Sequence, residues 1–274
     1  MTDRGAQIDF KKLLLRIWRE CNNDNVAGTA AELSYYFLLA LFPLLIFLTS
    51  LIGFLPDAPS GLIDYVARVA PPDALKLVRE TLTDVVKNRS GGLLSFALIG
   101  TVWASSSGVA SLMEALNIAY EAKETRPFWK RRLIAIGLTM IFTLLVIGGS
   151  GLIIIGHRLG DWLEHSLGLG AALNVASTVL GYLTGLGLLL AGVGVLYTFG
   201  PDIKTKRRIL PGALFAAVGI VAGSLLFSFY LRAVPALSAT YGSLGAVVTL
   251  MLWLYLIGLL LLVGGEINSE VDRV

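Results

Sequence analysis

Residues 244–265 read LGAVVTLMLWLYLIGLLLLVGG, an apolar stretch without a charged side chain. An α-helix rises about 1.5 Å per residue, so roughly 20 apolar residues are enough to cross the hydrocarbon core of a bilayer. A surface helix of a soluble protein would need a polar face over the same length. This stretch therefore predicts a transmembrane helix.

Five further stretches are also long and apolar enough to span a membrane. They are 33–54, 92–113, 133–155, 171–198 and 211–231. Pro43 lies in the middle of the first one, where the loss of a backbone hydrogen bond predicts a kink. The chain is therefore predicted to be an all-α, polytopic membrane protein, a bundle of six transmembrane helices.

The composition excludes a soluble enzyme. Apolar residues make up 55% of the chain and charged residues only 15%. A soluble domain carries about 25% charged residues to cover its surface. The mean hydropathy of +0.76 agrees with the same class. Cys21 is the single cysteine, so the chain cannot form an internal disulfide.

The distribution of Lys and Arg predicts the orientation. With the N-terminus inside, the inner segments contain 15 of the 22 basic residues, and the short loops divide clearly. We therefore expect a multi-pass protein of the bacterial inner membrane with both termini in the cytoplasm. The predicted parts are a cytoplasmic segment 1–30, a membrane domain 31–268 and a cytoplasmic tail 269–274.

Two further segments show a helical pattern outside the predicted spans. Residues 8–20 place apolar and basic side chains on different sides, which is typical of a helix in the inner headgroup layer. A helix packed under the bundle would show the same pattern. In the outer loop 55–91, residues 73–88 repeat apolar positions at helical spacing, which predicts a small helical cap.

Motifs of known chemistry are absent from the sequence. It contains no phosphate-binding G-x-x-x-x-G-K-[ST] loop and no G-x-S-x-G nucleophile motif. His157 and His165 are the two histidines, and both fall in the predicted outer loop between the third and fourth spans, where solvated side chains are the simplest interpretation. We therefore predict no catalytic residue, no metal site, no cofactor, no nucleic-acid partner and no enzymatic activity.

Polar residues within or beside the predicted spans are the candidates for a transport pathway. Such residues are costly in lipid and normally face the bundle interior, a cavity or a partner. They are Glu32, Tyr35, Tyr36, Ser105, Ser106, Ser107, Glu114, Asn117, Glu266 and Asn268. The three glutamates are predicted near the cytoplasmic side, where they would converge or would pair with nearby Arg or Lys. The serines are also explained by helix packing, as are the pairs Gly181/Gly185 and Gly219/Gly223.

The sequence resembles the YihY/BrkB family of bacterial inner-membrane proteins. The resemblance rests on motifs along almost the whole chain: Leu33-Ser34-Tyr35-Tyr36, Leu41-Phe42-Pro43-Leu44, Ser107-Gly108-Val109, Arg126-Pro127-Phe128-Trp129-Lys130, Pro211-Gly212-Ala213, Tyr241-Gly242-Ser243-Leu244-Gly245 and Gly264-Gly265-Glu266-Ile267-Asn268. It implies six helices with both ends inside. Members of the family have been called virulence factors, transporters and "ribonuclease BN".

Two functions fit these observations. The first is a secondary transporter or exporter of a small amphipathic or lipid-like molecule, with carboxylates that bind protons or a cation. The second is an envelope scaffold or assembly factor that acts through the predicted outer cap; a membrane-associated ribonuclease is a distant third. The lipid bilayer is the predicted partner, together with a small-molecule substrate. Glycine-rich faces on the fourth and fifth spans permit a homo-oligomer.

Overall fold

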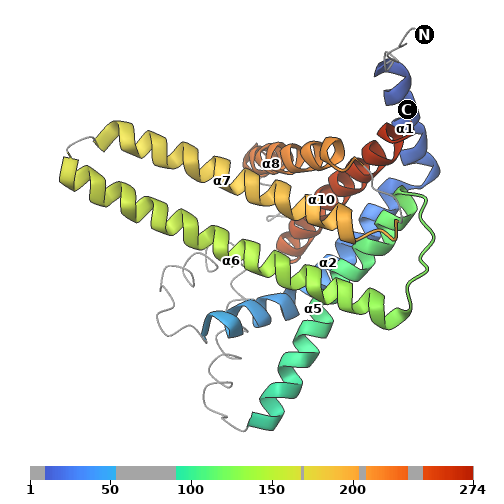
Figure 1. Ribbon diagram of the computed structural model, residues 1–274, viewed down its shortest axis with the longest axis horizontal. Helices are drawn as coiled ribbons and strands as arrows, with labels where there is room; N and C mark the ends of the chain where they lie inside the picture. Colours follow the sequence, from blue (N-terminus) through green and yellow to red (C-terminus); the bar gives the residue numbers. More distant parts are fainter. Residues whose placement is uncertain (1–9, 54–90, 168–169, 204–207, 234–242, 274) are drawn as a thin grey trace, which may run out of the picture. The chain divides into compact units, whose positions relative to one another are not determined.

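The fold is all-α over the residues that the computed structural model describes, namely 10–53, 91–167, 170–203, 208–233 and 243–273. Seven helices form these ranges, and none of the described residues lies in a strand (Figure 1). The helices are α1 (Phe10–Asn23), α2 (Val26–Gly53), α5 (Gly91–Ala119), α6 (Phe128–Leu167), α7 (Gly170–Phe199), α8 (Leu210–Ala233) and α10 (Ser243–Val271).

The six predicted membrane segments fall on α2, α5, α6, α7, α8 and α10. Among the described residues, four helical stretches are long and apolar enough to cross a membrane: Phe128–Gly149, Val179–Phe199, Leu210–Leu231 and Val247–Val271. Val26–Leu41 is a shorter apolar helix. A polytopic all-α membrane protein is therefore confirmed, while the full count of six spans stays a prediction. Pro43 lies inside α2, which continues past it to Gly53.

One sequence-based expectation is wrong. We expected an outer loop with His157 and His165 between the third and fourth spans, but α6 continues as a helix to Leu167. The segment contains few helix breakers between Gly156 and Leu167, so the backbone keeps its helical hydrogen bonds beyond the apolar stretch. The predicted cap at 73–88 lies outside the described residues.

The chain divides into two compact units. The first unit comprises Met1–Tyr35, Ser111–Arg131 and Val193–Val274, and the second comprises Tyr36–Ala110 and Arg132–Gly192. The first unit thus holds α1, the beginning of α2, the end of α5, the end of α7, and all of α8 and α10.

Close packing of α8 on α10 builds the interior of the first unit. Gly219 lies against Leu260 and Gly223 against Leu256, where even a methyl group would meet carbon atoms at about 3 Å. This confirms the packing role predicted for that glycine pair. For Gly181 and Gly185 of α7, no described atom lies within 4 Å of an added methyl group.

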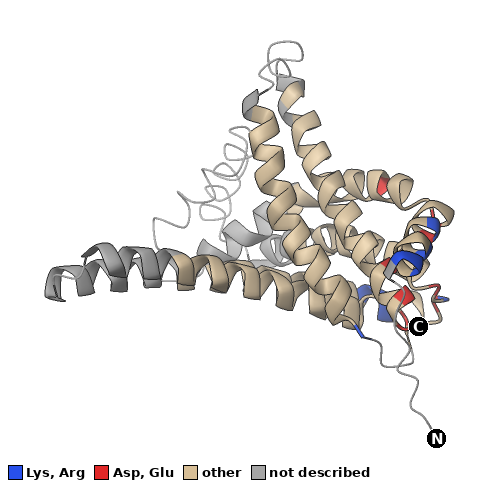
Figure 2. Ribbon diagram, turned by 90° about the horizontal axis from the view of Figure 1, so that it is seen from above, with Lys and Arg blue, Asp and Glu red and all other residues tan. Residues whose placement is uncertain are grey.

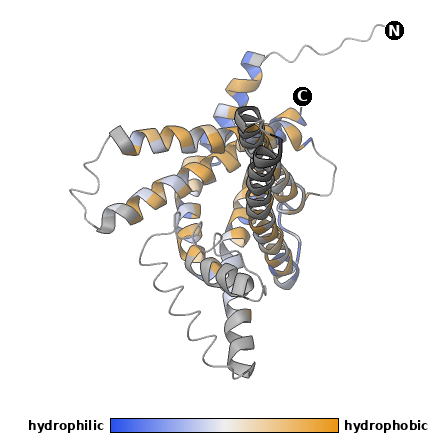
Figure 3. Cartoon of the chain, turned by 90° about the vertical axis from the view of Figure 1, so that its left-hand side faces the viewer, coloured by the Kyte–Doolittle hydropathy of each residue, from blue (hydrophilic) through white to orange (hydrophobic). Residues whose placement is uncertain are grey.

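A tight turn joins α1 to α2 in the first unit. Its Asn25 has a φ of 48°, a left-handed conformation that Asn tolerates better than most residues. The turn brings Asp24 beside α10, against which α1 also packs. The described parts of the long helices are mostly apolar, whereas α1 contains both polar and apolar residues (Figure 3). Charged residues gather around α1 and the adjoining helix ends and are sparse along the rest of the described helices (Figure 2).

Candidate functional site

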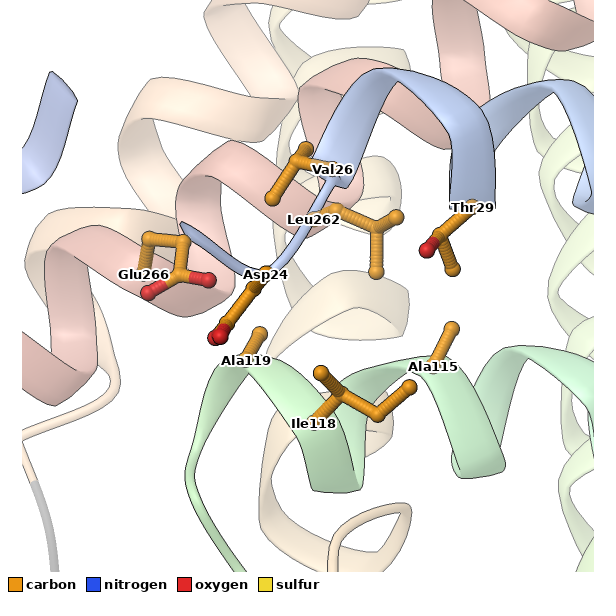
Figure 4. Close-up of a pocket in the computed structure, with 8 residues that line it drawn as sticks. All are labelled: Asp24, Val26, Thr29, Ala115, Ile118, Ala119, Leu262 and Glu266. Carbon is orange, nitrogen blue, oxygen red and sulfur yellow. The ribbon is translucent and has the colours of Figure 1, made fainter. Parts of the chain in front are cut away.

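A pair of carboxyl groups, Asp24 and Glu266, defines the candidate site in the first unit. Asp24 comes from the turn between α1 and α2, and Glu266 comes from the last turns of α10 (Figure 4). The two side chains lie close enough for Glu266 to affect the pKa of Asp24. Glu266 is only 2% exposed, and its Oε1 atom has no hydrogen-bond partner within the described part of the chain. We call these two residues the acid pair.

The surroundings of the acid pair are apolar on one side and acidic on the other. The pair lies at one end of a narrow pocket that has no room for an enclosed water molecule. Its remaining lining is Val26, Thr29, Ala115, Ile118, Ala119 and Leu262. Burial raises the pKa of Asp24 and is the largest effect. The neighbouring Glu266 lowers this pKa, the nearby Glu20 and Glu121 raise it again, and Arg273 lowers it slightly. Both conditions favour a bound proton over two ionised carboxylates.

Asn268 fixes the end of α10 beside the acid pair. Its Nδ2 donates to the hydroxyl of Tyr120 at 2.9 Å, and its Oδ1 accepts from the backbone N–H of Gly212 at 2.7 Å. Gly212 lies in the first turn of α8, where backbone N–H groups have no partner within their own helix. One fully buried side chain therefore ties α10 to α8 and to the end of α5.

Tyr197 makes a second polar tie to α10. Its hydroxyl donates to the carbonyl oxygen of Leu261 at 2.6 Å, and its ring packs edge-on against Tyr120 at 6.2 Å between centroids. Both tyrosines are at most 1% exposed. The acid pair therefore rests on a helix that neighbouring elements hold in position.

A network of loop residues, which we call the loop clamp, joins the loop after α5 to the end of α7. Arg126 donates to both carboxylate oxygens of Glu124 at 2.7 Å, and to the carbonyl oxygen of Gly200 at 2.8 Å. Asn117 donates to Glu124 at 2.9 Å and accepts from the backbone N–H of Asp202 at 2.7 Å. The hydrogen bonds from Arg126 lower the pKa of Glu124 more than burial raises it.

The lowered pKa of Glu124 gives stability a dependence on acid pH. A carboxyl whose pKa falls on folding stabilises the native state at pH values above its ordinary pKa of 4.5. This contribution to stability is lost as the pH drops below 4.5. We therefore expect the melting temperature of the wild-type protein in detergent to decrease when the pH is lowered through this range. The Glu124→Gln variant should be less stable than the wild type by about 1–3 kcal/mol at pH 7. Its melting temperature should decrease less at acid pH than that of the wild type. Thermal unfolding monitored by circular dichroism measures both.

The control for this experiment is Glu114→Gln. The Glu114 side chain is 68% exposed and lies 3.7 Å from Arg131, an arrangement that contributes little in water. This variant should melt close to the wild type at neutral pH. A Glu124→Gln protein with the stability of the wild type at pH 7 would contradict the role given to the loop clamp.

The predicted pathway residues separate into buried and exposed groups. Glu266, Asn268 and Asn117 are buried in the first unit, at 2%, 0% and 5% exposure. Glu32 and Tyr35 of α2 are exposed, and Glu114 faces outward beside Arg131. Of the three glutamates expected to converge, Glu266 is the one found among the described residues that line the pocket.

Tyr36 and the three serines belong to the second unit. Ser105 and Ser106 are buried, and their hydroxyls donate to carbonyl oxygens one turn earlier in α5, at 3.0 and 2.9 Å. Ser107 accepts a hydrogen bond from Arg132 at 3.1 Å, and the Arg132 guanidinium lies 4.1 Å from the centre of the Trp103 ring. These contacts agree with the packing interpretation of the serines.

Asp24 is the site residue that sequence reasoning missed. It lies two residues before the start of α2 at Val26, and its neighbours Asn22, Asn23 and Asn25 suggest only a solvated turn. Glu124 and Asp202 of the loop clamp were missed for the same reason. The available signal was the acidic character of a short loop next to a helix end, which sequence alone does not distinguish from ordinary surface charge.

Long apolar helices, a buried acid pair and polar ties between helix ends together define a multi-pass α-helical membrane protein. The family model "Virulence factor BrkB" matches residues 17–274, and the chain belongs to this family.

Curated relatives agree with this assignment. A Bacillus subtilis (strain 168) protein named as ribonuclease-like protein YfkH is 39% identical over 248 residues, covering 89% of each chain. A Psychromonas ingrahamii protein named "UPF0761 membrane protein" is 26% identical and covers 95% of this chain and 87% of its own. No solved structure matches the chain.

Proposed function

We propose that this protein is a proton-coupled secondary transporter, an exporter of a small amphipathic or lipid-like molecule across the bacterial inner membrane. In this proposal both termini lie in the cytoplasm and the protein catalyses no covalent reaction. The observation that supports it best is the acid pair: Glu266 is almost fully buried, and one of its carboxylate oxygens has no hydrogen bond to any described residue.

Energetics favour a functional role for this carboxyl. Burial of this carboxyl without a cationic partner among the described residues is expensive for the ionised form, and in membrane proteins such groups mark ion and proton pathways. A structural acid would be expected to pair with Arg or Lys, as Glu124 does with Arg126. Glu266 instead faces Asp24, with Glu20 and Glu270 nearby. Two adjacent carboxyl groups bind one proton between them more readily than they both ionise.

The apolar side chains beside the pair support an amphipathic substrate. Val26, Ile118 and Leu262 offer an apolar surface next to a group whose charge changes with the bound proton. Binding or release of a proton would therefore change the affinity of this pocket for a molecule that has both a polar and an apolar part. Such a change is the requirement for coupling proton movement to export.

The experiment that tests the proposal compares cells lacking the protein with cells that carry it. Untargeted mass spectrometry is applied to the medium, the cytosol and the envelope lipids. We expect a compound that accumulates inside the deletion strain and returns to the outside when the wild-type chain is restored. An envelope defect without redistribution of any compound would overturn the transporter proposal and favour the envelope scaffold.

A further inference from the structure

Helix α1 presents three different faces. Leu13, Ile17 and Cys21 are half-buried, as expected for the side that packs against α10. Burial on this side also raises the pKa of the Cys21 thiol to about 11. Glu20 is half-buried as well and lies at the helical spacing of the same face. The packed helix, one of the two alternatives considered from sequence, therefore holds for one face of α1, and the other faces remain exposed.

The second face of α1 is apolar and exposed. Leu14, Leu15 and Trp18 are 50%, 55% and 72% exposed, and helical spacing brings them to one side of α1. An isolated exposed leucine needs no explanation, but three large apolar side chains together form a strip that water disfavours. Tryptophan is also the residue that favours the boundary between lipid and water.

The third face is basic. Lys11, Lys12, Arg16 and Arg19 are all exposed. Helical spacing places Lys12, Arg16 and Arg19 on one face beside the apolar strip, and it places Lys11 one turn before Leu15 at the end of the strip itself. Glu20, on the packed side, is the one acidic residue of α1. An apolar strip beside a row of basic side chains matches the surface of a membrane that contains acidic headgroups, because the strip enters the boundary layer while the cations bind phosphate.

We propose that α1 is a binding site for anionic phospholipids at the membrane surface. Leu14, Leu15 and Trp18 enter the headgroup boundary, and Lys11, Lys12, Arg16 and Arg19 bind the acidic headgroups. This inference is independent of the proposed transport function, since it rests on residues outside the acid pair and its pocket. Charge complementarity selects lipid as the occupant: four exposed basic residues on and beside the strip would repel the same residues of a second copy.

The test places a polarity-sensitive fluorophore on the strip of the full-length protein. Cys21 is the single native cysteine, so Cys21→Ser combined with Leu15→Cys gives one labelled position. The protein is reconstituted into nanodiscs of phosphatidylcholine alone or of phosphatidylcholine mixed with phosphatidylglycerol. We expect the emission to shift to shorter wavelength in the anionic nanodiscs, and high salt to reduce this shift.

The matched variant carries Lys11→Gln, Lys12→Gln, Arg16→Gln and Arg19→Gln with the same label. Its emission should no longer respond to phosphatidylglycerol, while its elution volume and melting temperature stay those of the labelled parent. Water-like emission in both lipid mixtures would overturn the proposal. So would equally apolar emission in both mixtures, or emission that follows protein concentration in detergent and not lipid charge, which would place a second copy on the strip.

Discussion

Replacing Glu266 by glutamine is expected to abolish transport driven by a pH gradient while leaving the protein folded. Glutamine has nearly the shape of glutamate and can hydrogen-bond to Asp24, but it cannot take up or release a proton. In vesicles with reconstituted protein, the compound identified by the deletion experiment should then move at the rate seen in vesicles without protein. The measurement is the uptake of that compound after an imposed pH gradient.

The matched control is Glu121→Gln in the same unit. The Glu121 side chain is 58% exposed and pairs with Arg273 at 2.6 Å, outside the pocket. This variant should transport as the wild type does. A folded Glu266→Gln protein with wild-type transport would rule out the acid pair as the coupling site, even if the protein still proved to be a transporter.

Asp24→Asn gives a second readout of the acid pair that needs no substrate. Because the pKa of Asp24 is raised on folding, its protonated form is favoured in the native state. The contribution of protonated Asp24 to stability is present at low pH and is lost as the pH rises above the ordinary pKa of 3.8. Removal of the carboxyl by Asp24→Asn should therefore reduce the decline of melting temperature with rising pH. Opposite behaviour would show that ionised Asp24 is stabilised in the folded protein.

Gly212→Val is expected to prevent the protein from folding into its membrane-embedded state. A β-carbon at Gly212 would overlap the backbone carbonyl oxygen of Gly264 on α10 and the side chain of Asn268. Neither can yield cheaply, since the first is backbone in a neighbouring helix and the second is fully buried and hydrogen-bonded. Overpacking of this kind costs about 3 kcal/mol or more, a large part of the stability of a typical protein.

The yield of monodisperse protein after extraction in detergent measures this effect, and Gly212→Ala should already lower it. The control is Gly137→Ala on α6, where no described atom lies within 4 Å of the added methyl group. Alanine favours helix over glycine, so this control should be neutral or slightly stabilising. A Gly212→Ala protein with wild-type yield and melting temperature would contradict the close approach of α8 to α10.

The apolar stretches were sufficient to predict most of the helices. All six predicted segments lie on observed helices, because roughly 20 apolar residues in lipid must satisfy their backbone hydrogen bonds internally. The same reasoning failed at the end of α6, where hydropathy falls while the helix continues to Leu167. Hydropathy reports which residues prefer lipid, and a helix may extend beyond that region wherever its backbone bonds remain favourable.

Sequence alone also identified Glu266, Asn268 and Asn117 as polar residues at helix ends, but it assigned the same status to Glu32 and Glu114. Only the tertiary structure separates them, since it buries Glu266 beside Asp24 and leaves Glu114 exposed beside Arg131. The physical reason is that the cost of an ionisable group depends on its neighbours in space. Asp24 and Glu266 are far apart in the sequence, and they meet because the turn after α1 reaches the last turns of α10.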